Sequence, residues 1–513
     1  MKKTGMAHTK KAIAAICLTG MSVSMLAGCG DDKEAGAGTA TPATGASAGA
    51  AASSAPAEPL KLNVMMIQQL AEPPKKDAAA LKKMEEYTNT KLDISWVPGA
   101  GTNYDDKVSA TIASGTMPDL LLLRKLKESA QLNAQLSGVF WDVTPFLKDT
   151  KNLSKMSEVA KTNAGVNGQL FGIPRERVLA RYGMIFRKDW LDALGLQQPK
   201  TVDDIYNVAK AFTLNDPDKN GKNDTFGIQE DATMELLKQL VLYAGGPNGW
   251  GLLDGKVSPD FLHPEFKPAL DLYKKMISEK IIMPDFPIAK KYDYFNQEKA
   301  GIYFAVLDDA YTRHVDLQKK NPKVVVDVAL NFDGAKGQRV RGTFGYDSML
   351  VIPKQSVKTE AKVKQIIDYI DKLGDEPMQT LLKWGVEGVD YTVEGGKAKK
   401  IEGAAGIGDF LNFKWDTPNS GLAGNKTALE EKVDKLIADN KQLAIVDMSA
   451  SLLSETNLQK GSELKKGMTD AQTKYVLGEL DEAGWNSAIE KWRKDGGDKV
   501  IEEFTAAYNK AKK

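Results

Sequence analysis

The chain has 513 residues, with 69 basic and 68 acidic side chains and a formal net charge of +1 at pH 7. Charges of both signs alternate along it, which excludes the basic stripe typical of nucleic-acid-binding proteins. The only cysteines, Cys17 and Cys29, exclude a disulfide-rich fold. The length is sufficient for two domains with a large buried core.

Residues 1–28 are typical of a lipoprotein signal peptide. Four lysines within residues 2–11 precede the apolar run AIAAICLTGMSVSML, which is too short for a stable membrane span. The tetrad LAGC follows, and its cysteine, Cys29, is the predicted site of lipidation (palmitate) after cleavage. We therefore expect a lipid-anchored protein on the extracytoplasmic face of the cell membrane. An ordinary signal peptide with an unrelated cysteine is the alternative.

Residues 29–58 are predicted to form a disordered tether. Ala, Gly, Ser, Thr and Pro dominate this stretch, and it has no large apolar side chain to bury. Such a segment cannot offset the entropy lost on ordering.

The first half of the folded part alternates strand and helix patterns. We expect strands at 60–66, 92–97 and 119–123, and helices at 74–89 and 104–114. The run Asp119-Leu120-Leu121-Leu122-Leu123 fits a strand that is covered on both faces. The order β-α-β-α-β predicts a parallel sheet with right-handed crossovers.

Helices dominate the remainder, with short extended segments between them. The predicted helices cover 188–194, 201–212, 231–244, 264–279, 359–373, 375–384, 427–440, 469–478 and 481–507. The extended segments are 170–174, 182–187, 301–306, 324–330 and 346–352. These elements predict two α/β lobes joined by more than one crossover.

The two lobes are expected to share the folded part of the chain as four alternating segments. The first lobe takes residues 59–180 and 301–370, and the second lobe takes 181–300 and, as a mainly helical part, 371–513.

The most specific internal motif is DPDKNGKND at 216–224, within a loop expected at 216–227. Its spacing places oxygen donors at positions one, three, five and nine and glycine at position six, as in an EF-hand. The predicted structural calcium ligands are Asp216, Asp218, Asn220, the carbonyl of Lys222, Asp224 and Thr225.

Position twelve of this loop is Gly227, where an EF-hand has a bidentate glutamate. Thr225, Glu230 or Asp231 is expected to complete the coordination. The alternative is a polar turn before a strand at 226–228.

Aromatic and arginine side chains are the candidates for ligand binding. Rings beside polar groups suit sugars, whose C–H faces pack on aromatics, and arginine forks bind carboxylates or vicinal hydroxyls. The predicted ligand-binding residues are Trp250, Tyr346, Trp384, Trp415, Arg177 and Arg181. For the arginines, ion pairs within the protein are an equal alternative.

Enzyme motifs are absent, so we expect no catalysis. The sequence has no G-x-S-x-G elbow, no P-loop, and no G-x-G-x-x-G after the early strand. Its three histidines do not cluster, which argues against zinc.

Several stretches, in this order and at these spacings, resemble family 1 of the extracellular solute-binding proteins, in the branch of alginate-oligosaccharide-binding lipoproteins. They are ASGTMPD (113–119), GQLFGIPR (168–175), FRKDWLDALGL (186–196), WGVEGVDYT (384–392) and WRKDGGDKV (492–500). The resemblance implies a periplasmic-binding-protein-like α/β fold with a cleft and several hinge crossovers. It also implies a calcium ion on the loop at 216–224, although Thr225 stands where that branch has a carboxylate.

The expected function is capture of a carbohydrate, in particular an oligosaccharide, by hinge closure, and its delivery to an ABC permease. We expect a monomer with no nucleic-acid partner. The alternatives are a surface enzyme acting on polysaccharides and a ligand-sensing subunit of a signalling system.

Overall fold

The computed structural model describes residues 58–417 and 420–512. The predicted signal peptide, the predicted lipidation site Cys29 and residues 29–57 of the predicted tether lie outside this part of the chain. Within it, no helix is both long and apolar enough to cross a membrane.

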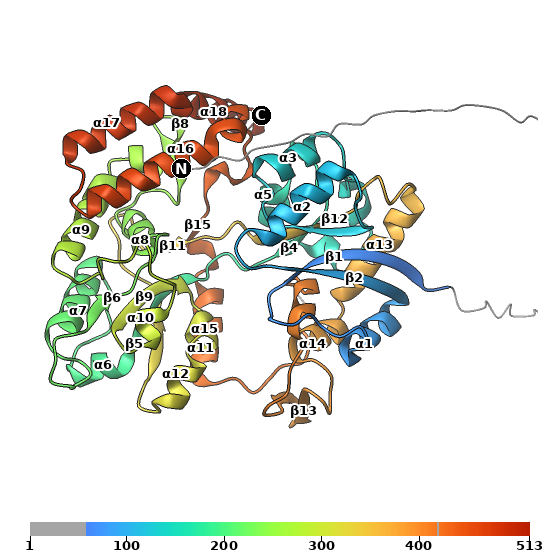
Figure 1. The fold of residues 1–513 in the computed structure, drawn as a ribbon, viewed down its shortest axis with the longest axis horizontal. Helices are drawn as coiled ribbons and strands as arrows, with labels where there is room; N and C mark the ends of the chain where they lie inside the picture. Colours follow the sequence, from blue (N-terminus) through green and yellow to red (C-terminus); the bar gives the residue numbers. More distant parts are fainter. Residues whose placement is uncertain (1–57, 418–419, 513) are drawn as a thin grey trace, which may run out of the picture. The chain divides into compact units, whose positions relative to one another are not determined.

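The first lobe is built on a five-stranded sheet in the order β2-β1-β3-β12-β4 (Figure 1). Its strands are β1 (Leu60–Gln68), β2 (Thr90–Pro98), β3 (Leu120–Leu123), β4 (Ile173–Glu176) and β12 (Tyr346–Val351). The predicted parallel pairing is confirmed, since β1 pairs in parallel with both β2 and β3. The four leucines of β3 are all buried, as expected for a strand covered on both faces. Strand β12 runs antiparallel to β3 and β4, so the sheet is mixed.

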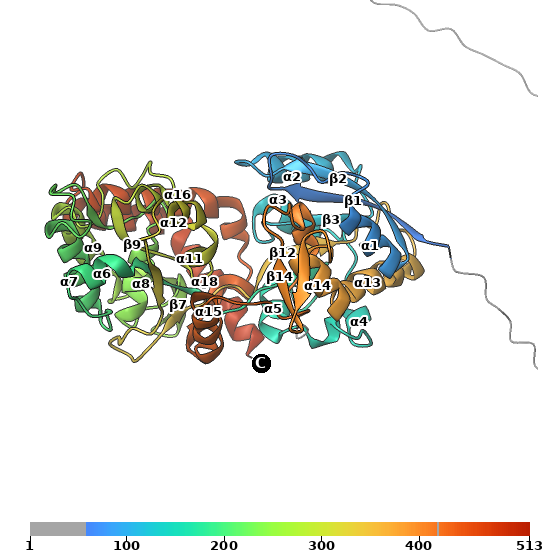
Figure 2. The same cartoon turned by 90° about the horizontal axis from the view of Figure 1, so that it is seen from below.

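Helices cover the strands of this lobe, and Figure 2 shows α1 and α2 beside β1 and β2. Each helix buries an apolar stripe, as α13 does with Val363, Ile366 and Ile370. These helices are α1 (Ala79–Thr88), α2 (Asn103–Ser114), α3 (Ser129–Leu136), α4 (Thr144–Leu147), α5 (Glu158–Ala164), α13 (Glu360–Leu373) and α14 (Glu376–Trp384). A hairpin of β13 (Tyr391–Glu394) and β14 (Lys397–Lys400) follows α14.

The second lobe is built on a four-stranded sheet in the order β10-β5-β9-β6. Its strands are β5 (Tyr182–Arg187), β6 (Phe226–Ile228), β9 (Ala300–Val306) and β10 (Val326–Ala329). Strand β5 is antiparallel to β9 and β10, and β6 is parallel to β9. The carboxyl ends of β6, β9 and β10 therefore lie at the same edge as the amino end of β5.

Helices and one hairpin complete this lobe up to residue 320. The helices are α6 (Lys188–Ala193), α7 (Val202–Leu214), α8 (Glu235–Tyr243), α9 (Phe266–Ser278), α10 (Asp293–Asn296), α11 (Asp309–Thr312) and α12 (Val315–Lys320). The predicted N-cap Thr201 is confirmed, because its side chain and that of Asp204 form a capping box on α7. The hairpin joins β7 (Trp250–Leu253) to β8 (Lys256–Pro259).

Four more helices follow near the C-terminus: α15 (Ala428–Asp439), α16 (Glu455–Val476), α17 (Glu482–Trp492) and α18 (Asp498–Ala511). The helix predicted at 469–478 begins earlier, because the Ser454 side chain caps it and accepts from the amide of Asn457. The single helix predicted at 481–507 is two helices, joined through Arg493–Gly497, where Gly496 has φ 141°. Glycine permits this change of direction at no steric cost.

The strand pairing differs from the predicted division at 301–370. Strands β9 and β10 pair with β5 in the second lobe, and the chain returns to the first lobe only at β12. The division at 371 differs as well, since α14 and the turn η3 (Gly408–Phe413) pack in the first lobe's core. An apolar strand pattern predicts burial but does not name its pairing partner.

Within the described residues, three crossing segments therefore connect the lobes. They are residues 177–181 after β4, residues 342–345 after β11 (Val340–Arg341), and residues 414–427 after η3, with 418 and 419 undescribed. Strand β11 pairs in parallel with β15 (Ala444–Ile445). The predicted α/β fold of two lobes with several crossovers is confirmed.

Candidate functional site

Arg177 ties the three crossing segments together. Its Nη2 lies 2.6 Å from Oδ2 of Asp347, at the start of β12, and its Nη1 lies 4.0 Å from Asp416 in the third segment. Its backbone N–H donates to the carbonyl of Gly345 at 2.8 Å. Burial acts to raise the pKa of Asp416, but Lys414 and Arg177 outweigh it and lower that pKa. The segments thus meet at one charge network.

Arg181, in the first crossing segment, and Arg341, at the end of β11, lie opposite each other, since Ala180 and Gly342 form an antiparallel bridge. Nη2 of Arg181 contacts both carboxylate oxygens of Asp308, at 2.6 and 2.7 Å. Arg341 donates to Glu235 at 2.8 Å, and its guanidinium stacks 4.3 Å from the centre of the Tyr182 ring. Arg177 and Arg181, both predicted to bind a ligand, are thus held in ion pairs within the protein.

Trp250, another predicted ligand-binding residue, borders a pocket of about 340 Å³. We call it the Trp250 pocket, and it is lined by residues 245–247, 250–253 and 263–265 with Lys336, Arg339, Ile445, Val446 and Met448. The ring is fixed from behind by Phe504 and Trp492, with ring centroids at 4.9 and 6.4 Å. The volume lies within the range of small-molecule sites.

The Trp250 pocket adjoins the crossing segments. The side-chain amide of Asn248 donates to the carbonyl of Gly342 at 3.0 Å and to that of Ile445 at 2.8 Å. Ile445 lines the pocket and pairs with Arg341 in the β11–β15 ladder. A ligand in this pocket would therefore contact a wall that is bonded directly to the second crossing segment.

The remaining predicted aromatics are spread over the first lobe. Tyr346 begins β12 and stacks on Phe344, with centroids 6.2 Å apart. The indole N–H of Trp384 donates to the carbonyl of Leu422, and its ring packs against Gly424. Trp415 is only 1% exposed and belongs to the core, so the prediction that it faces a ligand does not hold in this structure. Its ring fills space beside Gly374.

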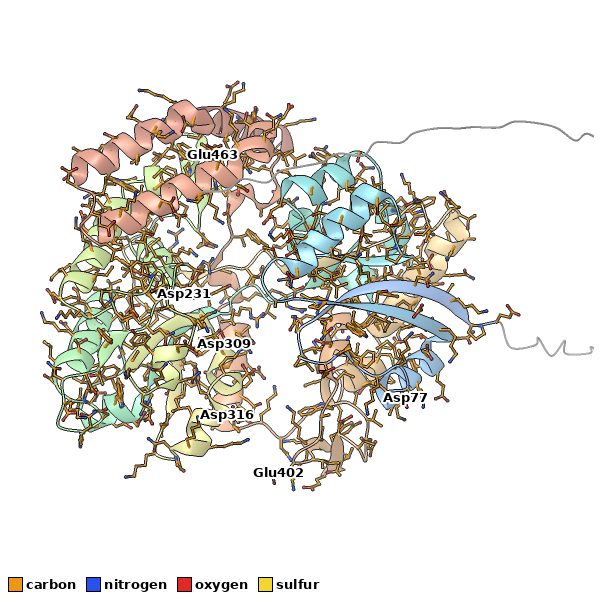
Figure 3. All side chains as sticks on the ribbon, viewed as in Figure 1. Asp77, Asp231, Asp309, Asp316, Glu402 and Glu463 are labelled. Atoms are coloured by element: carbon orange, nitrogen blue, oxygen red, sulfur yellow. The ribbon has the colours of Figure 1, made fainter. Side chains whose placement is uncertain are left out.

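Polar residues also gather where β6 and β9 end, at the edge nearest the crossing segments. Asp309 is 4% exposed, accepts from the Tyr292 hydroxyl, and lies near Lys291 and Arg313 (Figure 3, where Asp309 and Asp231 are labelled). The cavity beside them measures about 10 Å³, room for one water molecule and not for a sugar.

The loop at 216–224 folds its polar side chains toward one another. Asp216 accepts from the amides of Asn220 and Gly221, both at 3.0 Å. The Asn220 side-chain amide donates to Asp218 at 2.7 Å and to Asp224 at 3.1 Å. Burial, and after it the contact with Asp216, raises the pKa of Asp218. Three acids gathered in one loop repel each other unless a cation is present, and oxygen donors of this kind suit Ca²⁺.

Other predicted donors lie elsewhere. The Thr225 hydroxyl is buried and donates to the carbonyl of Phe212 at 2.7 Å. Glu230 and Asp231 follow the far end of β6 and do not reach the loop. Among the described residues, no group of three or more His, Cys, Asp or Glu side chains has the geometry of a metal site.

Gly227 explains why position twelve has no glutamate. A Cβ at this position would lie 2.1 Å from the carbonyl oxygen of Ala209 in α7. The helix thus packs directly on the backbone of β6, and no side chain fits between them.

Sequence reasoning missed the pocket residues Lys336 and Arg339. Neither lies in a recognisable motif, because the pocket is assembled from four separate stretches of chain. The hairpin that carries Trp250 did have a signal, the pair Asp254-Gly255, which is typical of a two-residue β-turn.

Comparison with known proteins places the chain in a family. Residues 69–370 match the model of the bacterial extracellular solute-binding proteins. The chain is 35% identical over 469 residues to the polygalacturonan/rhamnogalacturonan-binding protein YtcQ of Bacillus subtilis (strain 168), covering 89% of this chain and 93% of the relative. It is 34% identical over 462 residues to the lipoprotein LipO of the same organism, and this match covers 86% of this chain and 91% of LipO.

The fold is similar to that of the alginate-binding protein AlgQ2, solved without calcium ion. The TM-score is 0.66 at 17% sequence identity, and the match covers 88% of this chain and 99% of that one. The family match extends over the whole sheet of the second lobe, over the sheet of the first lobe except β1, and over the first two crossing segments. The chain belongs to the bacterial extracellular solute-binding proteins.

Proposed function

We propose that this chain captures an oligosaccharide at the outer face of the cell membrane and delivers it, chemically unaltered, to the permease of an ABC importer. Membership of the solute-binding family supports the binding role. The names of YtcQ and AlgQ2 support a carbohydrate ligand, because each describes a protein that binds a polysaccharide.

The observation that carries this proposal is the Trp250 pocket beside the crossing segments. It combines a fixed indole ring, which can pack on the C–H face of a sugar, with polar groups that can bind hydroxyls. Its walls come from the second lobe, and Asn248 links them to Gly342 and Ile445.

Closure of the two lobes is the proposed mechanism. A ligand that contacts both lobes only in the closed form shifts the population toward that form. The permease then distinguishes the loaded protein from the empty one. The residues that must bend lie in the crossing segments, where Arg177 forms ion pairs with Asp416 and with Asp347 of β12.

We further propose that the loop at 216–224 binds one Ca²⁺ through Asp216, Asp218, Asn220, the Lys222 carbonyl and Asp224. The clustered acids support this ligand set. When bound, the ion would neutralise their repulsion and hold the loop between α7 and β6. The ion therefore has a structural role.

A lipid on Cys29 is proposed as the anchor, with residues 29–58 as the tether and the protein acting as a monomer. The LAGC tetrad supports lipidation, as does the name of the relative LipO. The anchor would keep the binding protein close to its permease.

Calorimetric titration with a panel of oligosaccharides, followed by chromatography of the recovered ligand, tests this proposal. We expect micromolar binding, about −8 kcal/mol, and unchanged ligand after long incubation. Trp250→Leu should weaken binding, whereas Trp141→Leu, in the first lobe and outside the pocket, should not. Recovery of shortened or modified sugar would instead indicate an enzyme, and binding of no sugar at all would refute the proposal.

A further inference from the structure

Arg339 carries a positive charge into the Trp250 pocket without a matching carboxylate. Its Nη1 donates to the carbonyl of Gly246 at 2.8 Å, and the side chain is half-buried. Among the described residues, no acid lies within ion-pair distance of its guanidinium. The acid that influences it electrostatically, Glu265, is already paired with another cation.

The other charges of the pocket balance one another. Lys336 Nζ lies 2.8 Å from Glu265 and donates to the carbonyl of Gly245 at 3.1 Å. His263 contacts Ser258, and burial lowers its pKa, which favours the neutral ring at pH 7. The pocket lining therefore has an excess of one positive charge, located on Arg339.

A buried acid outside the lining, Asp447, is engaged with other groups. Asp447 lies behind Gly249, and its Oδ1 accepts from both the amide and the hydroxyl of Ser449. It is not one of the residues that line the pocket. Arg339 thus remains the unmatched charge that an entering ligand meets.

The pocket shape adds an apolar surface to this cation. The Trp250 ring is held by Phe504, and Pro247 lies beside Gly251, where an added Cβ would approach the proline at 2.5 Å. At Gly245, an added Cβ would meet the Lys336 stem at 2.8 Å. These glycines let Pro247 and the Lys336 stem pack closely in the pocket wall beside the indole.

We infer that the captured oligosaccharide is acidic, with a uronic acid residue in this pocket, and that Arg339 determines the preference for acid over neutral sugars. The inference rests on the proposed function. A guanidinium binds a carboxylate through two parallel charge-assisted hydrogen bonds, and a neutral hydroxymethyl or ester group cannot replace them.

Titration with tri-galacturonic acid and with its fully methyl-esterified form tests the inference, because these ligands differ only in the ester groups and the charge. Wild-type protein should bind the acid more tightly by a factor on the order of 10 to 100. Arg339→Gln should remove this difference by weakening binding of the acid. Arg339→Lys should keep part of the preference for the acid, because lysine keeps the positive charge but lacks the planar guanidinium that binds a carboxylate through two hydrogen bonds.

Arg313→Gln is the matched control, since Arg313 is exposed and outside the pocket. Equal binding of acid and ester by the wild type, or an unchanged preference in Arg339→Gln, would overturn the inference and leave sugar capture standing. If Arg339→Gln does not fold, the inference is still tested by comparing acid and ester binding in the wild type and in Arg339→Lys. Failure of the acid, the ester and neutral oligosaccharides alike to bind would refute the proposed function as well.

Discussion

Arg177, in the first crossing segment, and Asp347, in β12 just after the second, meet at 2.6 Å, between Nη2 and Oδ2. Arg177 is largely buried, with 19% of its side chain exposed, whereas Asp347 is 41% exposed. Arg175, buried beside them, approaches the same carboxylate at 3.4 Å. The segments between the lobes are therefore linked by side chains as well as by backbone, so they should bend together.

Breaking this link should lower stability. Arg177→Met removes the cation and leaves Asp347 and Asp416 partly unpaired, at an expected loss of about 1–3 kcal/mol, less than for a fully buried pair because Asp347 is solvated. Urea unfolding measures the loss. Lys188→Met, which breaks the exposed pair with Asp192, should cost under about 0.5 kcal/mol. Equal effects of the two variants would contradict a special role for Arg177.

Stability should fall as pH rises through the neutral range because of Glu230. Burial raises its pKa to about 8, from the ordinary value of 4.5. Between these values the folded state keeps a proton that the unfolded chain releases, so the free energy of unfolding decreases with rising pH. Burial also raises the pKa of Asp260 to about 7 and of Asp447 to about 6, which acts in the same direction.

Glu230→Gln isolates this contribution, because glutamine accepts from the Leu236 amide and can pair with the Tyr273 hydroxyl without titrating. Between pH 5.5 and 8.5, the variant should lose less stability than the wild type, by an amount on the order of 3 kcal/mol. Urea unfolding at both pH values measures it. The exposed Glu463 (Figure 3) provides the control Glu463→Gln, which should follow the wild type. If the free energy of unfolding changed with pH equally in the wild type, Glu230→Gln and Glu463→Gln, a protonated Glu230 in the folded state would be excluded.

Gly227→Ala should destabilise the second lobe by about 1–3 kcal/mol, because the new methyl group meets the Ala209 carbonyl of α7. The matched control is Gly467→Ala in α16, where a Cβ meets no atom within 4 Å. Removing this glycine from a helix should stabilise by about 0.5–1 kcal/mol. Thermal melting compares the two, and a neutral Gly227→Ala would mean that α7 and β6 move apart easily.

Calcium should raise the melting temperature. At a calcium concentration one hundred times Kd, the gain is about 2.7 kcal/mol. Asp216→Ala should abolish the response, and Asp316→Asn, at an exposed position of α12, should preserve it. A melting temperature that is the same in calcium and in chelator would contradict the proposed site.

Cys29→Ser should release the protein from the membrane if the LAGC cysteine carries the lipid. Fractionation of cells with an antibody against the chain measures the distribution. Cys17→Ser, within the predicted signal peptide, is the control and should leave the protein membrane-bound. Retention of both variants at the membrane would show that another feature anchors the chain.

Local sequence patterns predicted the early part of the fold because its buried side chains recur at the regular spacings of strands and helices. The leucines of β3 and the alternation in β2 identified strands, and their order implied the parallel β1–β2–β3 arrangement that the structure has. Thr201 correctly marked the start of α7. These features depend on neighbours within a few residues.

Long-range choices were not predictable in the same way. The apolar run at β9 predicts a buried strand but not the lobe to which it belongs. Its pairing with β5 places it in the second lobe. Trp415 stands near glycines and polar residues in sequence, yet its ring lies in the core against Gly374. The charge of Arg339 is unmatched because Glu265 is paired with Lys336. That pairing joins residues far apart in the sequence, so no local pattern predicts it.

Pulsed spin-label spectroscopy between Lys107→Cys in the first lobe and Lys319→Cys in the second, in a Cys29→Ser chain, tests the central claim most directly. Saturating oligosaccharide, shown by calorimetry to be bound, should shift and narrow the distance distribution, and washing the sugar out intact should restore it. An unchanged distribution with sugar bound would contradict capture by closure of two lobes.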